Sequence, residues 1–207
     1  MPVKLVQYWD VLKGKDGPFD DFFSSEFVPR INDTGLMMLT GSWRVASGEG
    51  PTFITEGVSR AIKDVEKLIT APSFIQLRRK LLSLVENYHS KLLVPTGVIP
   101  AKPVEIEHGY KFNQHYNVNP QDFYAFKDFE REEQMPGLES FGLEMLGGWY
   151  VAVGSTPHII AEGRVEEITT IGKMLQDPAY REMTLKLLGL VSCYGCKILV
   201  PSGHINR

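Results

Sequence analysis

Cysteine is scarce in this sequence of 207 residues, and long apolar runs are missing. Two cysteines cannot build a disulfide framework, so a reducing cytoplasm is the expected compartment. No stretch reaches the roughly 20 apolar residues that a membrane-spanning helix needs. The formal net charge is only −3, without the basic excess that is typical of nucleic-acid binding. We therefore expect neither a membrane nor a nucleic acid as a partner.

Several motifs that carry chemistry are also missing. The 19 glycines form neither a GxGxxG pattern nor a P-loop, so nucleotide binding is not supported. The five histidines show no metal-ligand spacing, and no metal site is expected. Cys193 and Cys196 have the spacing of a redox motif, but they fall where a helix is expected to end. A thiolate would be stabilised at a helix N-terminus, so redox or metal chemistry is not expected there.

Apolar and aromatic residues, in contrast, are plentiful. The sequence is 43% hydrophobic and contains 11 Phe and 8 Tyr. This composition excludes a disordered chain and is sufficient for a large buried core.

The chain contains an internal duplication. Residues 36–97 align without a gap on residues 142–203, at an offset of 106, with 23 identities in 62 positions. Identity of about 37% between two halves of one chain indicates a common origin. A connector with two prolines, residues 98–103, suits a short extended link. The expected units are therefore repeat 1, residues 1–103, and repeat 2, residues 104–207.

Each repeat is expected to contain a strand, a helix, two strands, a helix and a strand. In repeat 2 the period-two alternation over Tyr110–Val118 predicts the first strand. Segments 143–153 and 158–165 predict a hairpin. A helix broken at Asp177–Pro178 follows, with an apolar face through Tyr194, and a short strand over 197–200 closes the repeat.

This order is that of the ferredoxin-like βαββαβ unit, an α+β fold whose helices cover one face of an antiparallel sheet. The other face stays bare in an isolated copy. Packing two copies sheet to sheet buries both bare faces, so the fused repeats are expected to form one barrel within the chain.

A family resemblance supports this prediction. Gly41-Ser42-Trp43 and Gly147-Gly148-Trp149 give a Gly-x-Trp pattern, a Gly/Pro hairpin follows, and each repeat ends in Tyr-x-x-Lys-x-Leu-Val-Pro. These features resemble the dimeric α/β-barrel superfamily, and within it the NIPSNAP-type proteins as a fused tandem. The superfamily includes cofactor-free monooxygenases, haem-binding and haem-degrading proteins, isomerases and proteins without known activity. The resemblance therefore implies a fold and leaves the function open.

Strand parity predicts which residues face the barrel interior, where this architecture has its pocket. In repeat 2 these are Asn113, His115 and Asn117 on the first strand and His158, Ile160, Glu162 and Arg164 on the third. In repeat 1 they are Val6, Tyr8 and Asp10, with Thr52, Ile54, Glu56 and Val58.

The candidate catalytic residues are His115, Glu162 and Arg164, which together could do acid–base work or hold an anion. The candidate ligand-binding residues are Asn113, Asn117, His158, Tyr8, Asp10 and Glu56. A structural interpretation stands beside this one, because both repeats share the glutamates: Glu56 and Glu162 could pair with Lys91 and Lys197 or cap backbone groups. Trp43 and Trp149 are expected to be packing residues.

Three functions remain open. The first is an oxygenase or isomerase without a tightly held cofactor or metal, acting on a small, partly apolar molecule in the barrel. The second is a non-catalytic NIPSNAP-type binding or interaction protein. The third is haem binding through His115 or His158. A homo-oligomer is a further expectation, because the edge strands of two sheets commonly pair between chains.

Overall fold

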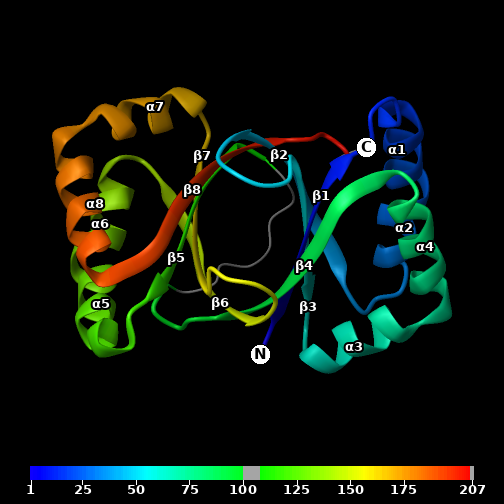
Figure 1. The fold of residues 1–207 in the computed structure, drawn as a ribbon, viewed down its shortest axis with the longest axis horizontal. Coiled ribbons are helices and arrows are strands. Elements are labelled where there is room, and N and C mark those ends of the chain that lie inside the picture. Colours follow the sequence, from blue (N-terminus) through cyan, green and yellow to red (C-terminus); the bar gives the residue numbers. More distant parts are fainter. Residues whose placement is uncertain (100–107, 206–207) are drawn as a thin grey trace.

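The computed structural model describes residues 1–99 and 108–205. Eight antiparallel strands close into a barrel in the order β1-β3-β2-β8-β5-β7-β6-β4 (Figure 1). The strands of repeat 1 are β1 (Val3–Val11), β2 (Met38–Ser47), β3 (Phe53–Ser59) and β4 (Val85–Pro95). The strands of repeat 2 are β5 (Tyr110–Val118), β6 (Glu144–Val153), β7 (Ile159–Val165) and β8 (Val191–Pro201).

Helices connect the strands in the same order in both repeats. In repeat 1 they are α1 (Asp16–Phe22), the π-helical turn η1 (Phe23–Phe27), α2 (Val28–Asn32), α3 (Ile62–Thr70) and α4 (Pro72–Leu82). In repeat 2 they are the 3-10 turn η2 (Pro120–Asp122), α5 (Phe123–Phe129), the π-helical turn η3 (Glu130–Gln134), α6 (Met135–Ser140), α7 (Ile168–Gln176) and α8 (Pro178–Leu190).

Each repeat has the ferredoxin-like strand order, β4-β1-β3-β2 in the first and β8-β5-β7-β6 in the second. The two sheets join edge to edge, because β2 pairs with β8 and β4 pairs with β6. The predicted fold, two fused ferredoxin-like units forming an α/β barrel, is confirmed. The expected boundary at residue 103 lies outside the described residues.

The barrel closes within one chain, so no strand of the described ring has a free edge. A homo-oligomer stays a prediction, but it loses the support of unpaired edge strands. Within residues 1–99 and 108–205, no helix is long and apolar enough to cross a membrane.

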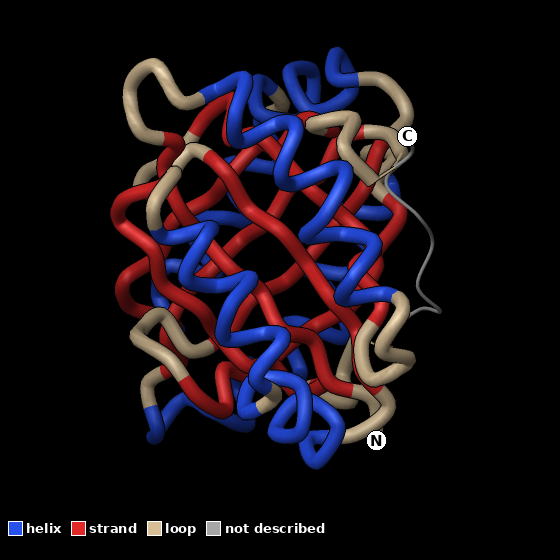
Figure 2. Tube along the Cα trace, turned by 90° about the vertical axis from the view of Figure 1, so that its right-hand side faces the viewer, coloured by secondary structure: helices blue, strands red, loops and turns tan. Residues whose placement is uncertain are grey.

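The helices form a layer on each side of the barrel (Figure 1), and the side view shows those of repeat 1 running across the tilted strands (Figure 2). Under the repeat 1 helices lies an aromatic core that includes Trp9, Phe19, Phe23, Phe27 and Phe53. The repeat 2 helices cover two smaller clusters. A fourth apolar cluster lies inside the barrel. The strands therefore have cores on both faces.

The predicted last helix of each repeat is too long, and the last strand too short. Helix α8 ends at Leu190 and β8 already begins at Val191, which places Tyr194 on the strand. Val191, Leu187 and Tyr194 all pack in one cluster beneath the repeat 2 helices. The apolar residues of α8 and of the start of β8 face the same core. The apolar pattern therefore continues past Leu190 without a break, and the predicted helix was too long.

The two cysteines are consequently strand residues. Cys193 and Cys196 lie on β8, not at a helix end, and both are free thiols. Cys193 has φ of 53°, and its repeat 1 counterpart Asn87 has φ of 55°. Both sit beside a register shift in the pairing with the first strand of their repeat, so the two copies share a bulge here.

The helix core of repeat 2 is more polar than that of repeat 1. The π-helical turns correspond at an offset of 107, so Glu130 and Gln134 stand where repeat 1 has Phe23 and Phe27. Glu130 is 1% exposed, and among the described residues its Oε1 has no hydrogen-bond partner. Burial raises the pKa of Glu130 to about 7, against a smaller opposing effect of Lys127.

This buried carboxyl makes stability depend on pH. Its pKa is higher in the folded protein, so its contribution to stability is present below pH 4.5 and is lost as pH rises through about 7. We expect Glu130→Gln to remove a fall of about 1–3 kcal/mol in the free energy of unfolding between pH 5 and pH 8. Urea titrations across this range measure it. The exposed Glu139→Gln is the control, and parallel curves for wild type and Glu130→Gln would contradict the expectation.

Candidate functional site

The barrel interior carries two buried lysines and two buried glutamates. Lys4 and Lys111 lie on the first strands of the two repeats, and Glu56 and Glu162 on the third strands. Lys4 Nζ is 2.5 Å from Glu162 Oε2, and Lys111 Nζ is 2.5 Å from Glu56 Oε2. The within-repeat distances are longer, 3.7 Å for Lys4 to Glu56 and 3.9 Å for Lys111 to Glu162. Each lysine thus bonds most closely to the glutamate of the other repeat.

The two tryptophans of the Gly-x-Trp pattern flank this ion quartet. Lys4 Nζ lies 4.4 Å from the Trp149 ring centroid, and Lys111 Nζ lies 4.9 Å from that of Trp43. Trp149 Nε1 also donates a hydrogen bond to Glu162 Oε2 at 2.9 Å. Each lysine is therefore bound by a carboxylate and by an aromatic face, which offsets part of the cost of burying its charge.

The ion quartet corrects the predicted pairing of the glutamates with Lys91 and Lys197. Burial opposes ionisation of Glu56, but Lys111 and Lys4 outweigh it and lower the pKa of Glu56 to about 2. Burial also acts against the charge on Lys4, yet Glu162 and Glu56 raise its pKa. The two ammonium groups and the two carboxylates balance one another in charge. Glu162 is thus a poor candidate for a general base, because its Oε2 already accepts hydrogen bonds from Lys4 Nζ and Trp149 Nε1.

A cavity of about 270 Å³ lies between the ion quartet and the hairpins β2–β3 and β6–β7. Eight-stranded barrels have room for one small ligand, and this volume is at the low end for ligand pockets. Its lining residues are Val6, Tyr8, Glu49, Gly50, Pro51, Ile54, Glu56, His89, Lys91, Asn113, His115, Ser155, Thr156, Pro157, Ile160, Glu162 and Lys197. The lining draws on both repeats in nearly equal measure.

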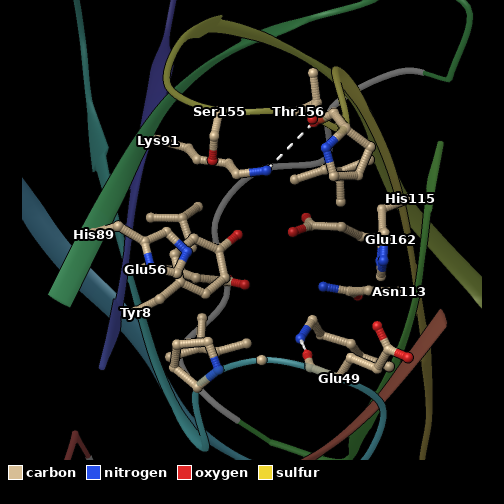
Figure 3. Close-up of a pocket in the computed structure, with 17 residues that line it drawn as sticks. Tyr8, Glu49, Glu56, His89, Lys91, Asn113, His115, Ser155, Thr156 and Glu162 are labelled. Atoms are coloured by element: carbon tan, nitrogen blue, oxygen red, sulfur yellow. Dashed lines mark hydrogen bonds between the residues drawn. The ribbon is translucent and has the colours of Figure 1, made fainter. Parts of the chain in front are cut away.

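Two different walls face each other across the cavity (Figure 3). On one side Tyr8 stacks on His89, with ring centroids 4.6 Å apart and an interplanar angle of 7°. On the other side His115 takes the position that Tyr8 has in repeat 1. Its pairing partner is Gly195, where an added Cβ would lie 2.5 Å from His115 Nε2. The missing side chain at Gly195 makes room for the imidazole.

Lys91 and Lys197 are equivalent residues of the two repeats, and each side chain extends to a hairpin of the opposite repeat. Lys91 Nζ donates to Pro157 O at 3.3 Å, and Lys197 Nζ donates to Glu49 O. Burial lowers the pKa of both, and Lys197 lowers that of Lys91 further. Burial, Lys197 and Lys91 together lower the pKa of His115 to about 4. Its imidazole is therefore neutral at pH 7 and can accept a proton or a hydrogen bond.

The structure brings five of the predicted site residues to this cavity. They are His115, Glu162, Asn113, Tyr8 and Glu56. Asn113 is 8% exposed, and among the described residues its Oδ1 has no hydrogen-bond partner. A ligand with a donor group could satisfy that oxygen.

Four predicted residues do not line the cavity. Arg164 lies two residues beyond Glu162 on β7, where it bonds to Glu144 and contacts His108 Nδ1 at 3.2 Å. Two strand residues span roughly 6.6 Å, which takes Arg164 toward the other end of the barrel.

The remaining three lie at the outer ends of the strands. Asn117 Oδ1 accepts from the backbone N–H of His158 at 2.8 Å, and His158 itself is exposed. Asp10 accepts from Thr52 and Asn87, which lowers its pKa although burial acts the other way. The side chains of Asn117 and Asp10 thus form hydrogen bonds that hold neighbouring loops against the strands.

Sequence reasoning missed Lys4 and Lys111 entirely, and it named Lys91 and Lys197 only as partners of the glutamates. Lys4 and Lys111 have the same strand parity as Tyr8 and His115, so extending the alternation by four residues would have placed them inside. Lys91 and Lys197 stand in the repeated Tyr-x-x-Lys pattern, but their reach across to the other repeat depends on how the two sheets join.

The described residues fit neither a metal nor haem. No group of three or more His, Cys, Asp or Glu in residues 1–99 and 108–205 could hold a metal ion. Of the two histidines considered for haem, only His115 lines the cavity, and its ring lies against Gly195. A space of about 270 Å³ offers little room for a macrocycle beside it.

Comparison with known proteins shows the fold of this chain and does not show its activity. No family model matches the chain, and no curated protein sequence matches it significantly. Among solved structures, a provisionally assigned monooxygenase from Lactobacillus acidophilus NCFM is 15% identical with a TM-score of 0.65, covering 96% of this chain and 93% of that one. A chlorite dismutase variant from Candidatus Nitrospira defluvii is 8% identical with a TM-score of 0.66, covering 99% and 93%. An anthrone oxidase-like protein is 14% identical with a TM-score of 0.58, covering 96% and 91%.

These similarities extend over nearly the whole chain. The protein shares the dimeric α/β-barrel fold. At 8–15% identity, the comparisons show distant structural similarity to these proteins and no specific activity.

The ion quartet predicts a large effect of removing one charge. Glu162→Gln leaves one buried positive charge in excess, so we expect it to lower the free energy of unfolding by about 3 kcal/mol or more. Adding Lys4→Met removes one charge of each sign and should recover part of that loss. Chemical denaturation measures both, with the exposed Glu66→Gln as a control within about 0.5 kcal/mol of wild type. A double variant less stable than Glu162→Gln alone would contradict this coupling.

The cavity also makes a prediction about haem. Haemin added to the purified protein is expected to give the same visible spectrum with wild type and His115→Ala, because a cavity of about 270 Å³ leaves little room for a macrocycle beside this imidazole. Titration followed at the Soret band measures this. A band shift that is lost in His115→Ala and kept in the exposed His158→Ala would place haem in the barrel.

Proposed function

We propose that the protein binds a small, partly apolar ring compound in the barrel cavity and removes a proton from it with His115. The neutral imidazole of His115 facing a mainly apolar cavity that opens to solvent is the observation that carries this proposal. Val6, Ile54 and Ile160 provide apolar contact for such a ring, and the Tyr8–His89 stack provides an aromatic wall.

His115 is the one catalytic candidate that is both in the cavity and free to accept a proton. Glu162 is committed to Lys4 and Trp149, and Arg164 lies toward the other end of the barrel. The nearby Lys91 and Lys197 would stabilise a negative charge that develops on the substrate as the proton leaves. A weakly basic histidine is adequate here because the product anion offsets the lysine charges that depress its proton affinity.

The proton transfer serves two reaction types. The C–H or O–H bond of the substrate breaks, its proton moves to His115, and the electron pair delocalises into the ring system. Return of the proton at another carbon completes an isomerisation. In a monooxygenation the anion bonds to dioxygen as co-substrate, and His115 returns the proton to the resulting peroxide. Loss of water with the second hydrogen of that carbon then leaves a C=O group. The similarity to a provisionally assigned monooxygenase and to an anthrone oxidase-like protein favours the second type.

The NIPSNAP resemblance supplies the alternative, a binding protein without catalysis. The ion quartet favours this alternative, because the glutamates that both repeats share have structural partners. A cytoplasmic setting remains part of either proposal, as the free cysteines suit a reducing compartment.

Two measurements test the catalytic proposal. Anthrone and neutral phenols serve as probes for oxygen uptake in an electrode cell and for solvent deuterium incorporation by NMR. We expect oxygen uptake or deuterium exchange above background, reduced at least 100-fold in His115→Ala, since general bases contribute about 10²–10⁴. His158→Ala, on the outer end of the same strand pair, should match wild type. Probe binding with no exchange and no uptake would leave the binding-protein alternative.

A further inference from the structure

We propose that Lys91 and Lys197 form an anion clamp, and that the ligand of the cavity is a ring compound carrying a carboxylate. This inference rests on the proposed small-molecule function of the cavity and names the class of compound that it takes. The anion clamp here means the two ammonium groups, one from β4 and one from β8, that line the cavity on opposite sides of the pseudo-twofold axis.

The position of the two lysines is built into the fold. Lys91 is 6% exposed and Lys197 is half-buried, and each extends toward the hairpin of the other repeat, where its Nζ donates to a backbone carbonyl at Pro157 or Glu49. Gly48 and Gly154, which begin these hairpins, have φ of 118° and 134°. An added Cβ at either would approach the facing lysine Cγ to 2.9 Å or 3.0 Å. Glycine is thus required where the lysine stems pass.

The clamp forms no ion pair with the described residues, and Glu49 acts on the charge of Lys197 only from beyond ion-pair distance. Among the described residues, neither Lys91 nor Lys197 has a carboxylate within 4.0 Å, whereas Lys4 and Lys111 each have two. The ion quartet below is neutral as a whole, so it does not neutralise the clamp. Ammonium groups without a carboxylate at ion-pair distance favour an anionic ligand, and the oxygens of a carboxylate accept hydrogen bonds from such groups.

Asn113 provides a second and independent feature. It is 92% buried, its Oδ1 lacks a hydrogen-bond partner within the described part of the chain, and it lies beside His115 in the cavity (Figure 3). An unsatisfied buried acceptor calls for a donor from the ligand. A ligand that satisfies both features has a carboxylate facing the clamp and a hydroxyl group facing Asn113. We therefore infer that the ligand is a hydroxylated aromatic acid.

Ligand binding and the protonation of His115 should therefore be linked. Lys197 and Lys91 both act to lower the pKa of His115. Tyr8, across the cavity, stays protonated because burial, Glu56 and Glu162 raise its pKa, so it adds no charge. His89 and Glu49 complete the titratable groups that line the mouth. A carboxylate that neutralises the clamp removes the repulsion, so binding the anion should raise the pKa of His115.

Isothermal titration with 2-hydroxybenzoate tests the clamp, with 2-hydroxybenzamide as the neutral match. We expect 2-hydroxybenzoate to bind at least tenfold more tightly than the amide, and Lys91→Met or Lys197→Met to remove most of that preference. Lys63→Met on the surface of α3 is the control. Equal affinity for acid and amide, or a preference that persists in both clamp variants, would overturn the clamp while leaving the cavity as a binding site. Binding of neither compound would overturn the clamp and the proposed cavity function together.

A measurement on the unaltered protein covers the case in which the variants do not fold. NMR titration of the His115 ring signals with and without 2-hydroxybenzoate should show the pKa rising by at least one unit with the acid present. An unchanged pKa at saturating acid would overturn the clamp. His158, exposed and outside the cavity, is the internal reference.

Discussion

The exchange of salt bridges between the repeats is the interaction on which the rest of this barrel depends. Lys4 reaches Glu162 and Lys111 reaches Glu56, so neither repeat can satisfy its own buried charges as closely as its partner does. The exchange fixes how the two sheets face each other, with the Gly-x-Trp tryptophans closing the sides. It also sets the depth of the cavity, because the ion quartet is the floor on which any ligand would rest. Apolar residues of the same size could fill this space, but they would specify the mutual position of the sheets less strictly.

The two repeats keep the same strand arrangement but differ in the residues that would contact a ligand in the cavity. Residues that both repeats keep form equivalent pairs, such as Lys91 with Lys197 and Glu56 with Glu162. The walls differ, because a stacked Tyr8–His89 pair in one repeat corresponds to His115 over Gly195 in the other. The outer core has diverged as well, since Glu130 stands in repeat 2 where repeat 1 packs Phe23. Fusion of two copies into one chain is what permits these differences.

Much of the fold could be read from the sequence because the duplication supplied two versions of each pattern. The strand over Tyr110–Val118 and the break at Asp177–Pro178 lie where the alternation and the proline place them. The last helix was wrong in length, since Val191 and Tyr194 contact the same core from a strand as they would from a helix. Parity placed His115 and Glu162 inside correctly but could not give depth along the barrel, which is why Arg164, Asn117 and His158 were grouped with them. The partners of Glu56 depend on the approach of two sheets, which no local pattern encodes.

The contrast between the two walls of the cavity has a consequence for stereochemistry. In a barrel made of two identical chains, a ligand on the twofold axis meets the same surface in either of two orientations and is bound equally in both. Here one end of a ring would meet the Tyr8–His89 stack and the other the imidazole of His115 (Figure 3). Gly195 makes room for the imidazole on the His115 side. The single chain can thus distinguish the two faces and the two ends of a flat molecule. For a ligand on the axis, such regioselectivity requires that the two halves of the barrel differ, and the divergence of the fused repeats provides that difference.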